Sequence, residues 1–425
     1  MEWSKYNYFF TSKDKFLLYN SLSNSFAELD EEVYFDLVNQ KERNLIDIKD
    51  KDLVEVLKSM KVIVNDERDD LNIIKYNAYR SRFYSKGLSL TINPTLHCNF
   101  ACSYCFEEDR LPVYMTEEVE DKIIEHIKGK EPKHVDVDWF GGEPLLAFDR
   151  IVSLTKKMQK LNVIYEAGMI TNGYLLTEKI INQLPSLNIN FMQITVDGLP
   201  NTHNSRRPLV SGKGTFDTIV KNIDLLKKIN PEIQLTIRIN IDHNNKNEFV
   251  EIYNFFSQKN YPNTYISGAF VHDIKSSKNL CFLNTKQQVK FLLEMKKEYN
   301  LNLRPFFPGS RRYECGIRNL NSIVIGPTGE VYKCFNDVGN KNKIVGNIDD
   351  SIETNNQLLL RYLVGADPFD DEKCKACFQL PICGGGCPYQ RIANEYEGGE
   401  FDTCNYFKEN MKEFLEIHYL NKTNS

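Results

Sequence analysis

The segment "LSLTINPTLHCNFACSYC", residues 88–105, decides the fold class of this chain. It opens with an apolar run typical of a β-strand and bounded by turn residues. Cys98, Cys102 and Cys105 then follow within eight residues. Because thiolates are soft ligands that select iron or zinc over hard cations, this spacing predicts a metal site just after a strand.

Three cysteines leave one coordination position open. Three thiolates can hold three irons of a 4Fe–4S cluster, and the fourth iron then stays available to a substrate or cofactor. A zinc site with a distant fourth ligand, such as His97, is an alternative that the spacing also permits.

Strand-like and helix-like segments alternate over the next 170 or so residues. Such alternation predicts βαβ units and a parallel sheet, either an open doubly wound layer or a partial barrel. In both, chemistry gathers at the carboxyl ends of the strands, where the three cysteines stand. We expect strands within 88–95, 134–142, 163–173, 189–198, 233–242 and 264–273, and helices within 116–130, 148–161, 177–184, 215–229 and 246–259.

Composition narrows the class of protein. The chain has 425 residues, with 53 Lys and Arg against 58 Asp and Glu, a net charge of −5. Nothing electrostatic therefore indicates a nucleic-acid or anionic-membrane partner. The start "MEWSKYNYFF" lacks the features of a secretory signal, and no apolar run is long enough to span a bilayer. We expect a cytoplasmic protein.

The eleven cysteines are clustered. Three lie at 98–105 and five at 374–404, Cys315 and Cys334 stand between these groups, and Cys281 is alone. Disulfides suit small secreted domains, whereas short spacings in a reducing compartment favour metal ligation.

Several motifs resemble those of the radical S-adenosylmethionine (radical SAM) family. "CNFACSYC" resembles its signature C-x3-C-x-aromatic-C, with Tyr104 as the aromatic residue, and "WFGGEP" at 139–144 resembles its GGEP motif. "TNG" at 171–173, "QITVDG" at 193–198 and "RIN" at 238–240 end later strands in the same order. The resemblance covers about residues 88 to 275 and implies a partial (β/α)6 TIM-like barrel.

The resemblance also implies cofactors and their ligands. A 4Fe–4S cluster on Cys98, Cys102 and Cys105 would cleave S-adenosylmethionine to a 5′-deoxyadenosyl radical. The glycines of the GGEP motif would let the backbone approach the methionine amino group, and Arg207 in "NSRRP" would contact its carboxylate. The implied cofactor-binding residues are Tyr104, Gly141, Gly142, Glu143, Thr195, Asp197 and Arg207.

The last third of the chain is similar to a SPASM domain. Its cysteines fit the pattern C…G-x4-C…C-x2-C-x5-C-x3-C…C, with Gly329 as the glycine. By resemblance it holds two auxiliary 4Fe–4S clusters, which makes three clusters in all. The first would use Cys315, Cys334 and Cys387, and the second Cys374, Cys377, Cys383 and Cys404. Two zinc ribbons are the alternative.

Seven cysteines cannot close two four-ligand clusters. The first auxiliary cluster lacks a fourth cysteine, because "CGIRNLNSIVIG" offers none after Cys315. Either one iron is open, or Cys281 reaches it, or another group or water fills the position. An open iron would bind a substrate thiolate and favour a thioether product.

The N-terminal segment resembles the PqqD-like (winged-helix) recognition element of peptide maturases. "FLLYNSLSNSFAELDEEVYFDLV" and "DLVEVLKSMKVIV" carry that pattern of two strands and two helices. Such a module binds a leader peptide by adding it as a strand to a sheet edge. A structural cap without a ligand is the alternative.

These resemblances predict three domains: 1–78 for leader recognition, 88–309 for the barrel with a bridging segment, and 310–425 for SPASM. The hypothesis is a radical SAM/SPASM enzyme that crosslinks a ribosomal precursor peptide and takes electrons from a flavodoxin or ferredoxin. Three alternatives stay open: a carbon–carbon crosslink in place of a thioether, an anaerobic sulfatase-maturing (formylglycine-forming) enzyme, and a non-catalytic iron–sulfur or zinc scaffold.

Overall fold

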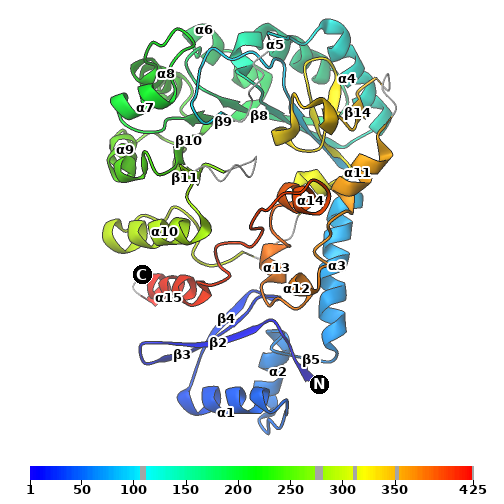
Figure 1. The fold of residues 1–425 in the computed structure, drawn as a ribbon, viewed down its shortest axis with the longest axis vertical. Coiled ribbons are helices and arrows are strands. Elements are labelled where there is room, and N and C mark those ends of the chain that lie inside the picture. Colours follow the sequence, from blue (N-terminus) through cyan, green and yellow to red (C-terminus); the bar gives the residue numbers. More distant parts are fainter. Residues whose placement is uncertain (106–111, 273–280, 310–313, 350–353, 424–425) are drawn as a thin grey trace. The chain divides into compact units, whose positions relative to one another are not determined.

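The computed structural model describes residues 1–105, 112–272, 281–309, 314–349 and 354–423 (Figure 1). The chain forms two compact units. The sheet unit comprises Ser85–Gln288 and Gly316–Leu363, and the terminal unit comprises Met1–Tyr84, Val289–Cys315 and Val364–Ser425. Each unit draws on more than one of the three predicted sequence domains, and those domain ranges stay a prediction.

The sheet unit contains the predicted parallel sheet. Its strands run in the order β11-β10-β9-β8-β7-β6, and every neighbouring pair is parallel. The alternation of strands and helices expected from the sequence is therefore confirmed. The strands are β6 (Gly87–Ile92), β7 (His134–Trp139), β8 (Ile164–Thr171), β9 (Ile189–Thr195), β10 (Gln234–Ile241) and β11 (Thr264–Phe270).

Apolar faces explain how this sheet is covered. In β7, Val135, Val137 and Trp139 are buried while the residues between them are exposed. Thr116 begins α4 by accepting a hydrogen bond from the Val119 N–H. A fully buried aliphatic side chain stabilises the fold by about 1.5–3 kcal/mol. The helices are α4 (Glu117–Lys130), α5 (Phe148–Met158), α6 (Glu178–Ile181), α7 (Pro200–Arg206), α8 (Phe216–Ile229) and α9 (Phe249–Ser257).

Three short strands extend the sheet beyond β6. β12 (Ser322–Ile325) pairs with β6 in parallel, and β13 (Glu330–Tyr332) and β14 (Gly346–Asn347) follow antiparallel. The sequence did not predict these three strands, because strands of two to four residues are too short to show a hydrophobic period.

The terminal unit opens with a three-stranded antiparallel sheet in the order β2-β3-β4. The two strands and two helices expected within residues 15–64 are confirmed, whereas β1, β2, β5 and the long helix α3 were missed. β1 and β5, which come before and after this sheet in the sequence, pair with each other as a separate two-stranded antiparallel sheet. The elements are β1 (Glu2–Trp3), β2 (Asn7–Ser12), β3 (Lys15–Asn20), β4 (Ser25–Leu29), α1 (Glu31–Glu42), α2 (Lys51–Ser59), β5 (Ile63–Val64) and α3 (Glu67–Phe83).

Both faces of the N-terminal sheet are covered. Leu18 packs with Leu37 of α1 and Leu57 of α2 in one apolar cluster. Elsewhere on this sheet Tyr8 stacks on Phe378, with ring centroids 5.5 Å apart, and Phe26 contacts Tyr419 at 6.3 Å. The first and last segments of the chain therefore share one core. The remaining helices are α10 (Thr285–Tyr299), α11 (Asn356–Leu363), α12 (Glu372–Lys375), α13 (Leu380–Cys383), α14 (Pro388–Tyr396) and α15 (Met411–Thr423).

A buried ion-pair network joins three segments of the terminal unit. The Arg82 guanidinium of α3 is fully buried and pairs with the carboxylates of Glu314 and Asp367. The rings of Tyr79 and Phe369 lie 5.0 and 5.9 Å from it. Burial lowers the pKa of Arg82, but the two carboxylates outweigh burial and raise it, so this arginine stays charged.

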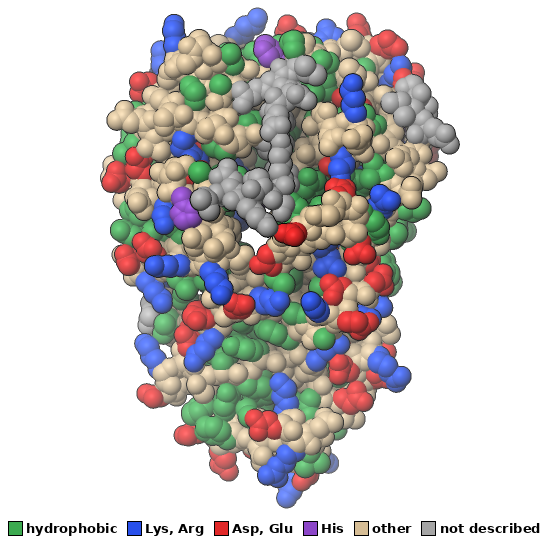
Figure 2. Space-filling view, viewed as in Figure 1, with side chains coloured by type: hydrophobic (Ala, Val, Ile, Leu, Met, Phe, Trp, Pro, Cys, Tyr) green, Lys and Arg blue, Asp and Glu red, His purple; other side chains and the backbone are tan. Residues whose placement is uncertain are grey.

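Charges are mixed on the surface. Figure 2 shows Lys and Arg side chains interspersed with Asp and Glu side chains on the face that it presents. Among the described residues, no helix combines the length and the apolar character needed to cross a membrane.

Candidate active site

The loop that carries Cys98, Cys102 and Cys105 is held by backbone hydrogen bonds on one side. The Ala101 N–H donates to the Pro208 carbonyl at 2.8 Å, and the Ser103 N–H donates to the Arg206 carbonyl at 3.1 Å. In return, the Val210 N–H donates to the Asn99 carbonyl at 2.9 Å. The cysteine loop is therefore paired strand-like with residues 206–210.

The GGEP motif holds the start of the same loop. The Gly142 N–H donates to Thr95 O at 3.2 Å and the Glu143 N–H donates to His97 O at 2.9 Å. A Cβ on Gly142 would lie 2.4 Å from the His97 carbonyl oxygen, and Gly141 has a φ of +113°. Both glycines are thus required for close packing against residues 95–97, a reason that the sequence analysis did not anticipate.

The Glu143 carboxylate is buried and fully engaged with the protein. It accepts hydrogen bonds from the Leu145 N–H at 3.0 Å, the Thr171 hydroxyl at 2.6 Å and the Asn172 N–H at 2.8 Å. Burial nevertheless raises its pKa above the ordinary value. Asn172 in turn donates to the Asn99 side chain at 2.8 Å. Glu143 therefore fixes the "TNG" turn, which supports the cysteine loop.

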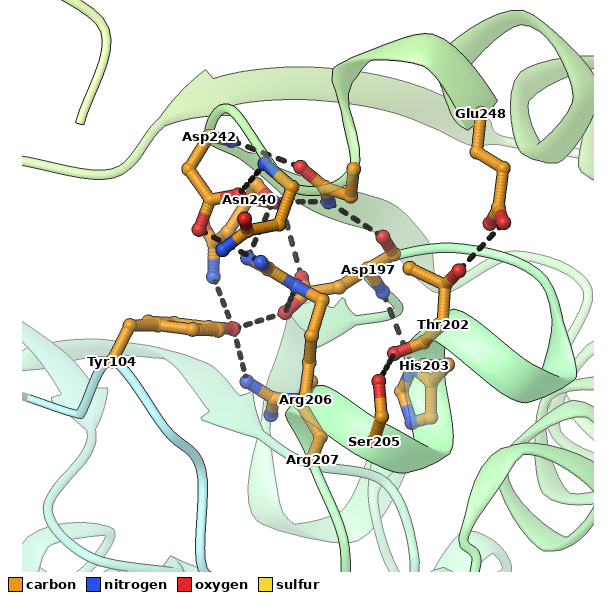
Figure 3. A network of polar contacts seen from close by, with 12 residues as sticks. Tyr104, Asp197, Thr202, His203, Ser205, Arg206, Arg207, Asn240, Asp242 and Glu248 are labelled. Atoms are coloured by element: carbon orange, nitrogen blue, oxygen red, sulfur yellow. Dashed lines mark hydrogen bonds and ion pairs between the residues drawn. The ribbon is translucent and has the colours of Figure 1, made fainter. Parts of the chain in front are cut away.

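Tyr104 is the centre of a polar network between the loop and the ends of β9 and β10 (Figure 3). Its hydroxyl donates to Asp197 and accepts from Arg207 Nη1 at 2.8 Å and from Asn240 Nδ2 at 3.1 Å. The Asn240 N–H also donates to Asp197 at 3.1 Å. Burial is the main reason that the pKa of Tyr104 is raised, so the phenol stays protonated.

The Arg207 guanidinium has a buried N–H group that is not used in any hydrogen bond among the described residues. Its side chain is 8% exposed, it lies 5.7 Å from the Phe100 ring, and its buried Nε has no hydrogen-bond partner among the described residues. Although burial lowers the pKa of Arg207, the neighbouring Tyr104, Cys102 and Asp197 raise it well above the usual value. A buried cation with an open donor fits an anionic group such as a carboxylate.

His203 was missed by the sequence analysis. Its Nδ1 accepts from the Asp197 N–H at 3.1 Å, so the proton sits on Nε2, which contacts the Thr215 hydroxyl at 3.0 Å. Thr215 donates to the Arg207 carbonyl at 2.8 Å. Burial, reinforced by Arg207 and Arg206, lowers the pKa of His203 to about 3. This neutral histidine therefore positions both Asp197 and Arg207.

Three more residues complete the network. Arg206 Nη1 pairs with Asp242 at 2.7 Å, and Asn245 Nδ2 donates to the Asp197 carbonyl at 2.6 Å. None of them was predicted as a site residue. Arg206 stands in the "NSRRP" segment, where only Arg207 was assigned a role, and a single Asp or Asn in a polar loop gives no signal in sequence. Thr195, which was predicted, ends β9 opposite Arg238 of β10.

Family comparison agrees with this geometry. Residues 92–256 match the Radical SAM superfamily. This chain is a radical SAM enzyme. It is 27% identical over 372 residues to a cysteine-type anaerobic sulfatase-maturating enzyme of Clostridium perfringens (strain 13 / Type A), an alignment that covers 78% of this chain and 96% of that enzyme. The non-catalytic scaffold is thereby set aside.

Solved structures share the fold of this radical SAM enzyme. Native anSMEcpe with bound AdoMet and Cp18Cys peptide matches with a TM-score of 0.62 and 24% identity, over 80% of this chain and 98% of that chain. Streptococcus suis SuiB bound to its precursor peptide SuiA matches with a TM-score of 0.54 and 15% identity, over 96% of this chain and 99% of that chain.

The thiols of the radical SAM signature repel one another as thiolates. Burial raises the pKa of Cys98 to about 12, and Glu143, Cys102 and Cys105 add to this, while the Phe100 N–H opposes it. A bound iron cluster would stabilise these thiolates. His97, the alternative zinc ligand, instead contacts the Tyr114 hydroxyl through Nδ1 at 2.7 Å.

The other predicted ligands divide between the units. Cys334 belongs to the sheet unit, and the other C-terminal cysteines belong to the terminal unit. Gly386 has a φ of +81°, and a Cβ on it would lie 1.9 Å from the Thr403 carbonyl oxygen. The loop after Cys383 therefore touches the segment that carries Cys404. Among the described residues, no three His, Cys, Asp or Glu side chains are grouped to hold a metal ion, so the ligand sets stay predictions.

Proposed function

We propose that this radical SAM enzyme crosslinks a ribosomally synthesised precursor peptide that carries a leader, with a thioether as the favoured product. When bound, S-adenosylmethionine and a 4Fe–4S cluster on Cys98, Cys102 and Cys105 supply the radical that removes a hydrogen atom from the peptide. The protein binds, orients and shields the reactants.

The network around Tyr104 accounts for cofactor binding in this proposal. Arg207 would pair with the methionine carboxylate through its open donor, because a guanidinium forms strong charge-assisted bonds with carboxylates. Tyr104 and Asp197 hold Arg207 in place. His203 positions Asp197 directly and Arg207 through the Thr215 hydroxyl. Such fixed donors need no rearrangement when the cofactor binds.

One observation supports a peptide as the substrate: the sheet of β2, β3 and β4 has two open edges. In the part of the chain that the structure describes, no further strand pairs with β2 or with β4. Unpaired edge strands accept extended peptides by β-augmentation. Two solved structures with bound peptides support a peptide substrate: anSMEcpe with the Cp18Cys peptide matches 80% of this chain, and SuiB with the precursor peptide SuiA matches 96%.

The strand register shows which backbone groups face outward. Counted from the two-residue turn between Ser12 and Lys15, the hydrogen-bonded pairs of β2 and β3 alternate, which leaves the Thr11 N–H on the outer edge. The same alternation across β3 and β4 leaves the Glu28 N–H on the opposite outer edge. Both side chains are exposed, so either residue can be replaced without opening the core.

Proline at these positions tests leader binding. Thr11→Pro and Glu28→Pro each remove one outward N–H and no bond within the sheet. We expect one of them to weaken binding of a fluorescent leader peptide about tenfold, the effect of one lost backbone hydrogen bond. Thr11→Ala and Glu28→Ala, which keep the N–H, serve as matched controls. If both proline variants bind like the wild type, the module is only a cap.

Sulfatase maturation is the second candidate, favoured by the 27% identity to the Clostridium perfringens enzyme. The two reactions differ in the fate of sulfur. A thioether retains the sulfur of the substrate cysteine, whereas conversion of cysteine to formylglycine removes it. Mass spectrometry of a precursor peptide and of a sulfatase-derived cysteine peptide, each incubated with the reconstituted enzyme, distinguishes them.

A further inference from the structure

We propose that Arg391 and Lys408 hydrogen-bond to ligand sulfurs of the second auxiliary cluster and raise its reduction potential. The inference rests on the proposed function and on the SPASM resemblance, which implies that Cys374 and Cys404 are ligands of that cluster. Neither cation belongs to a cysteine motif. Both lie in the terminal unit, on α14 and in the loop before α15.

Arg391 is fixed against one sulfur by three contacts. Its Nη1 donates to Cys374 Sγ at 3.5 Å, its Nη2 pairs with Asp371 at 3.1 Å, and its Nε donates to the Ala366 carbonyl at 2.9 Å. The side chain is 11% exposed. Asp371 also caps α12 by accepting from the N–H groups of Lys373 and Cys374. The guanidinium therefore has one orientation, which directs a charged donor at the sulfur.

Lys408 gives the second contact from a different segment. Its Nζ lies 3.0 Å from Cys404 Sγ. Both residues are exposed, so the contact requires no buried charge. Two cations from separate elements thus approach two of the four predicted ligand sulfurs.

A buried hydroxyl points to a ligand in the same place. Tyr6 is fully buried in an apolar cluster with Phe369 and Leu380, and Cys374 packs against that cluster. Among the described residues the Tyr6 hydroxyl has no hydrogen-bond partner. A buried hydroxyl without a partner destabilises the fold, and a hydrogen-bond acceptor such as a sulfur of the cluster would remove that cost. Two cations and this hydroxyl, placed beside predicted ligand cysteines, are hydrogen-bond donors of the kind that the sulfurs of an iron–sulfur cluster accept.

The electrostatic consequence concerns a one-electron couple. Reduction adds one negative charge to the cluster, and nearby cations and hydrogen-bond donors stabilise that form more than the oxidised one. Closing a thioether from a carbon radical and a thiol releases one electron and one proton. With Arg391 and Lys408 in place, the cluster is a better acceptor for that electron, while the proton passes to solvent.

The test uses the full-length protein with Cys98, Cys102 and Cys105 changed to Ala, so that only auxiliary clusters remain. Arg391→Gln and Lys408→Met are compared in redox titrations followed by electron paramagnetic resonance. For each we expect one cluster to reduce at a potential lower by about 59 mV, a tenfold change in the equilibrium constant of a one-electron couple. Arg391→Lys and Lys412→Met, an exposed cation on α15, serve as controls that keep the wild-type potential.

Two failures are distinguishable. If both variants keep full iron content and the wild-type potential, the inference is overturned while the cluster assignment stands. If the wild-type protein holds zinc or no metal on these cysteines, the proposed function fails, and the inference with it. Should Arg391→Gln lose iron, Lys408→Met decides, because its exposed side chain can be replaced without disturbing the fold.

Discussion

The two cysteine-rich regions of this enzyme are built in opposite ways. The loop with Cys98 follows a strand of a parallel sheet and is hydrogen-bonded on both sides, to residues 206–210 and to the GGEP motif. The region 374–404 instead uses the four-residue helices α12 and α13, the nine-residue helix α14 and a run of left-handed glycines. The first loop is positioned by hydrogen bonds to residues distant in the sequence, whereas the backbone hydrogen bonds of the second region mostly join residues three to six positions apart. We therefore expect the second region to depend more on bound metal.

The largest expected effect concerns the first loop. Changing Cys98, Cys102 and Cys105 together to Ala should abolish cleavage of S-adenosylmethionine and leave iron for about two clusters, because the three thiolates hold one cluster. The backbone pairing of this loop does not need the thiols, so the melting temperature should change little. Iron analysis, 5′-deoxyadenosine assays and calorimetry measure the three quantities. A collapse of the melting temperature would show that this loop also needs its metal.

Removing cysteines from the second region should lower the local stability of that region. Cys374→Ala with Cys377→Ala should remove one cluster and lower hydrogen-exchange protection across residues 366–404, while cleavage of S-adenosylmethionine continues in the absence of peptide. Unchanged protection would contradict the contrast between the regions.

Arg82 tests how far the terminal unit depends on contacts other than metal. Arg82→Met leaves the Glu314 and Asp367 carboxylates buried without their cation, which should lower the free energy of unfolding by about 3–5 kcal/mol. Urea denaturation of the apoprotein measures this. Arg80→Met, on the exposed side of the same helix, is the control and should have little effect.

Arg207 tests the cofactor side of the first region. Arg207→Gln removes the charge proposed to bind the methionine carboxylate and should weaken S-adenosylmethionine binding at least about tenfold. Lys213→Gln replaces an exposed cation nearby and should bind like the wild type. Equal affinities, measured by calorimetry, would place the carboxylate elsewhere.

The last effect is a dependence of stability on pH. His203 has its pKa lowered to about 3 in the fold, against about 6.5 when unfolded, so the unfolded chain takes up a proton first. The stability that the neutral imidazole contributes is present above pH 6.5 and is lost as the pH falls toward 3. His203→Gln should therefore show a weaker loss of stability over this range. Parallel curves for the two proteins would contradict a neutral buried histidine.

The sequence predicted the elements that show a hydrophobic period and the site residues that belong to a motif. Strands β6 to β11 were found because strand-like segments alternate regularly with helix-like segments. Tyr104, Asp197 and Arg207 were found through motifs and do meet in one network. Their binding to the cofactor stays a prediction. His203 was missed because a single histidine in a short helix carries no pattern, although it lies one turn before Arg207. Strands β12 to β14 were missed because they are too short.

The most direct test of the central claim is product analysis. The reconstituted enzyme is incubated anaerobically with S-adenosylmethionine, a reductant and a cysteine-containing precursor peptide that carries a leader. The proposed function predicts 5′-deoxyadenosine together with a peptide that has lost two hydrogen atoms, kept its sulfur and lost a free thiol. A peptide whose cysteine has lost its sulfur would instead identify sulfatase-type maturation, and an unmodified peptide beside rapid cofactor cleavage would contradict the proposed substrate.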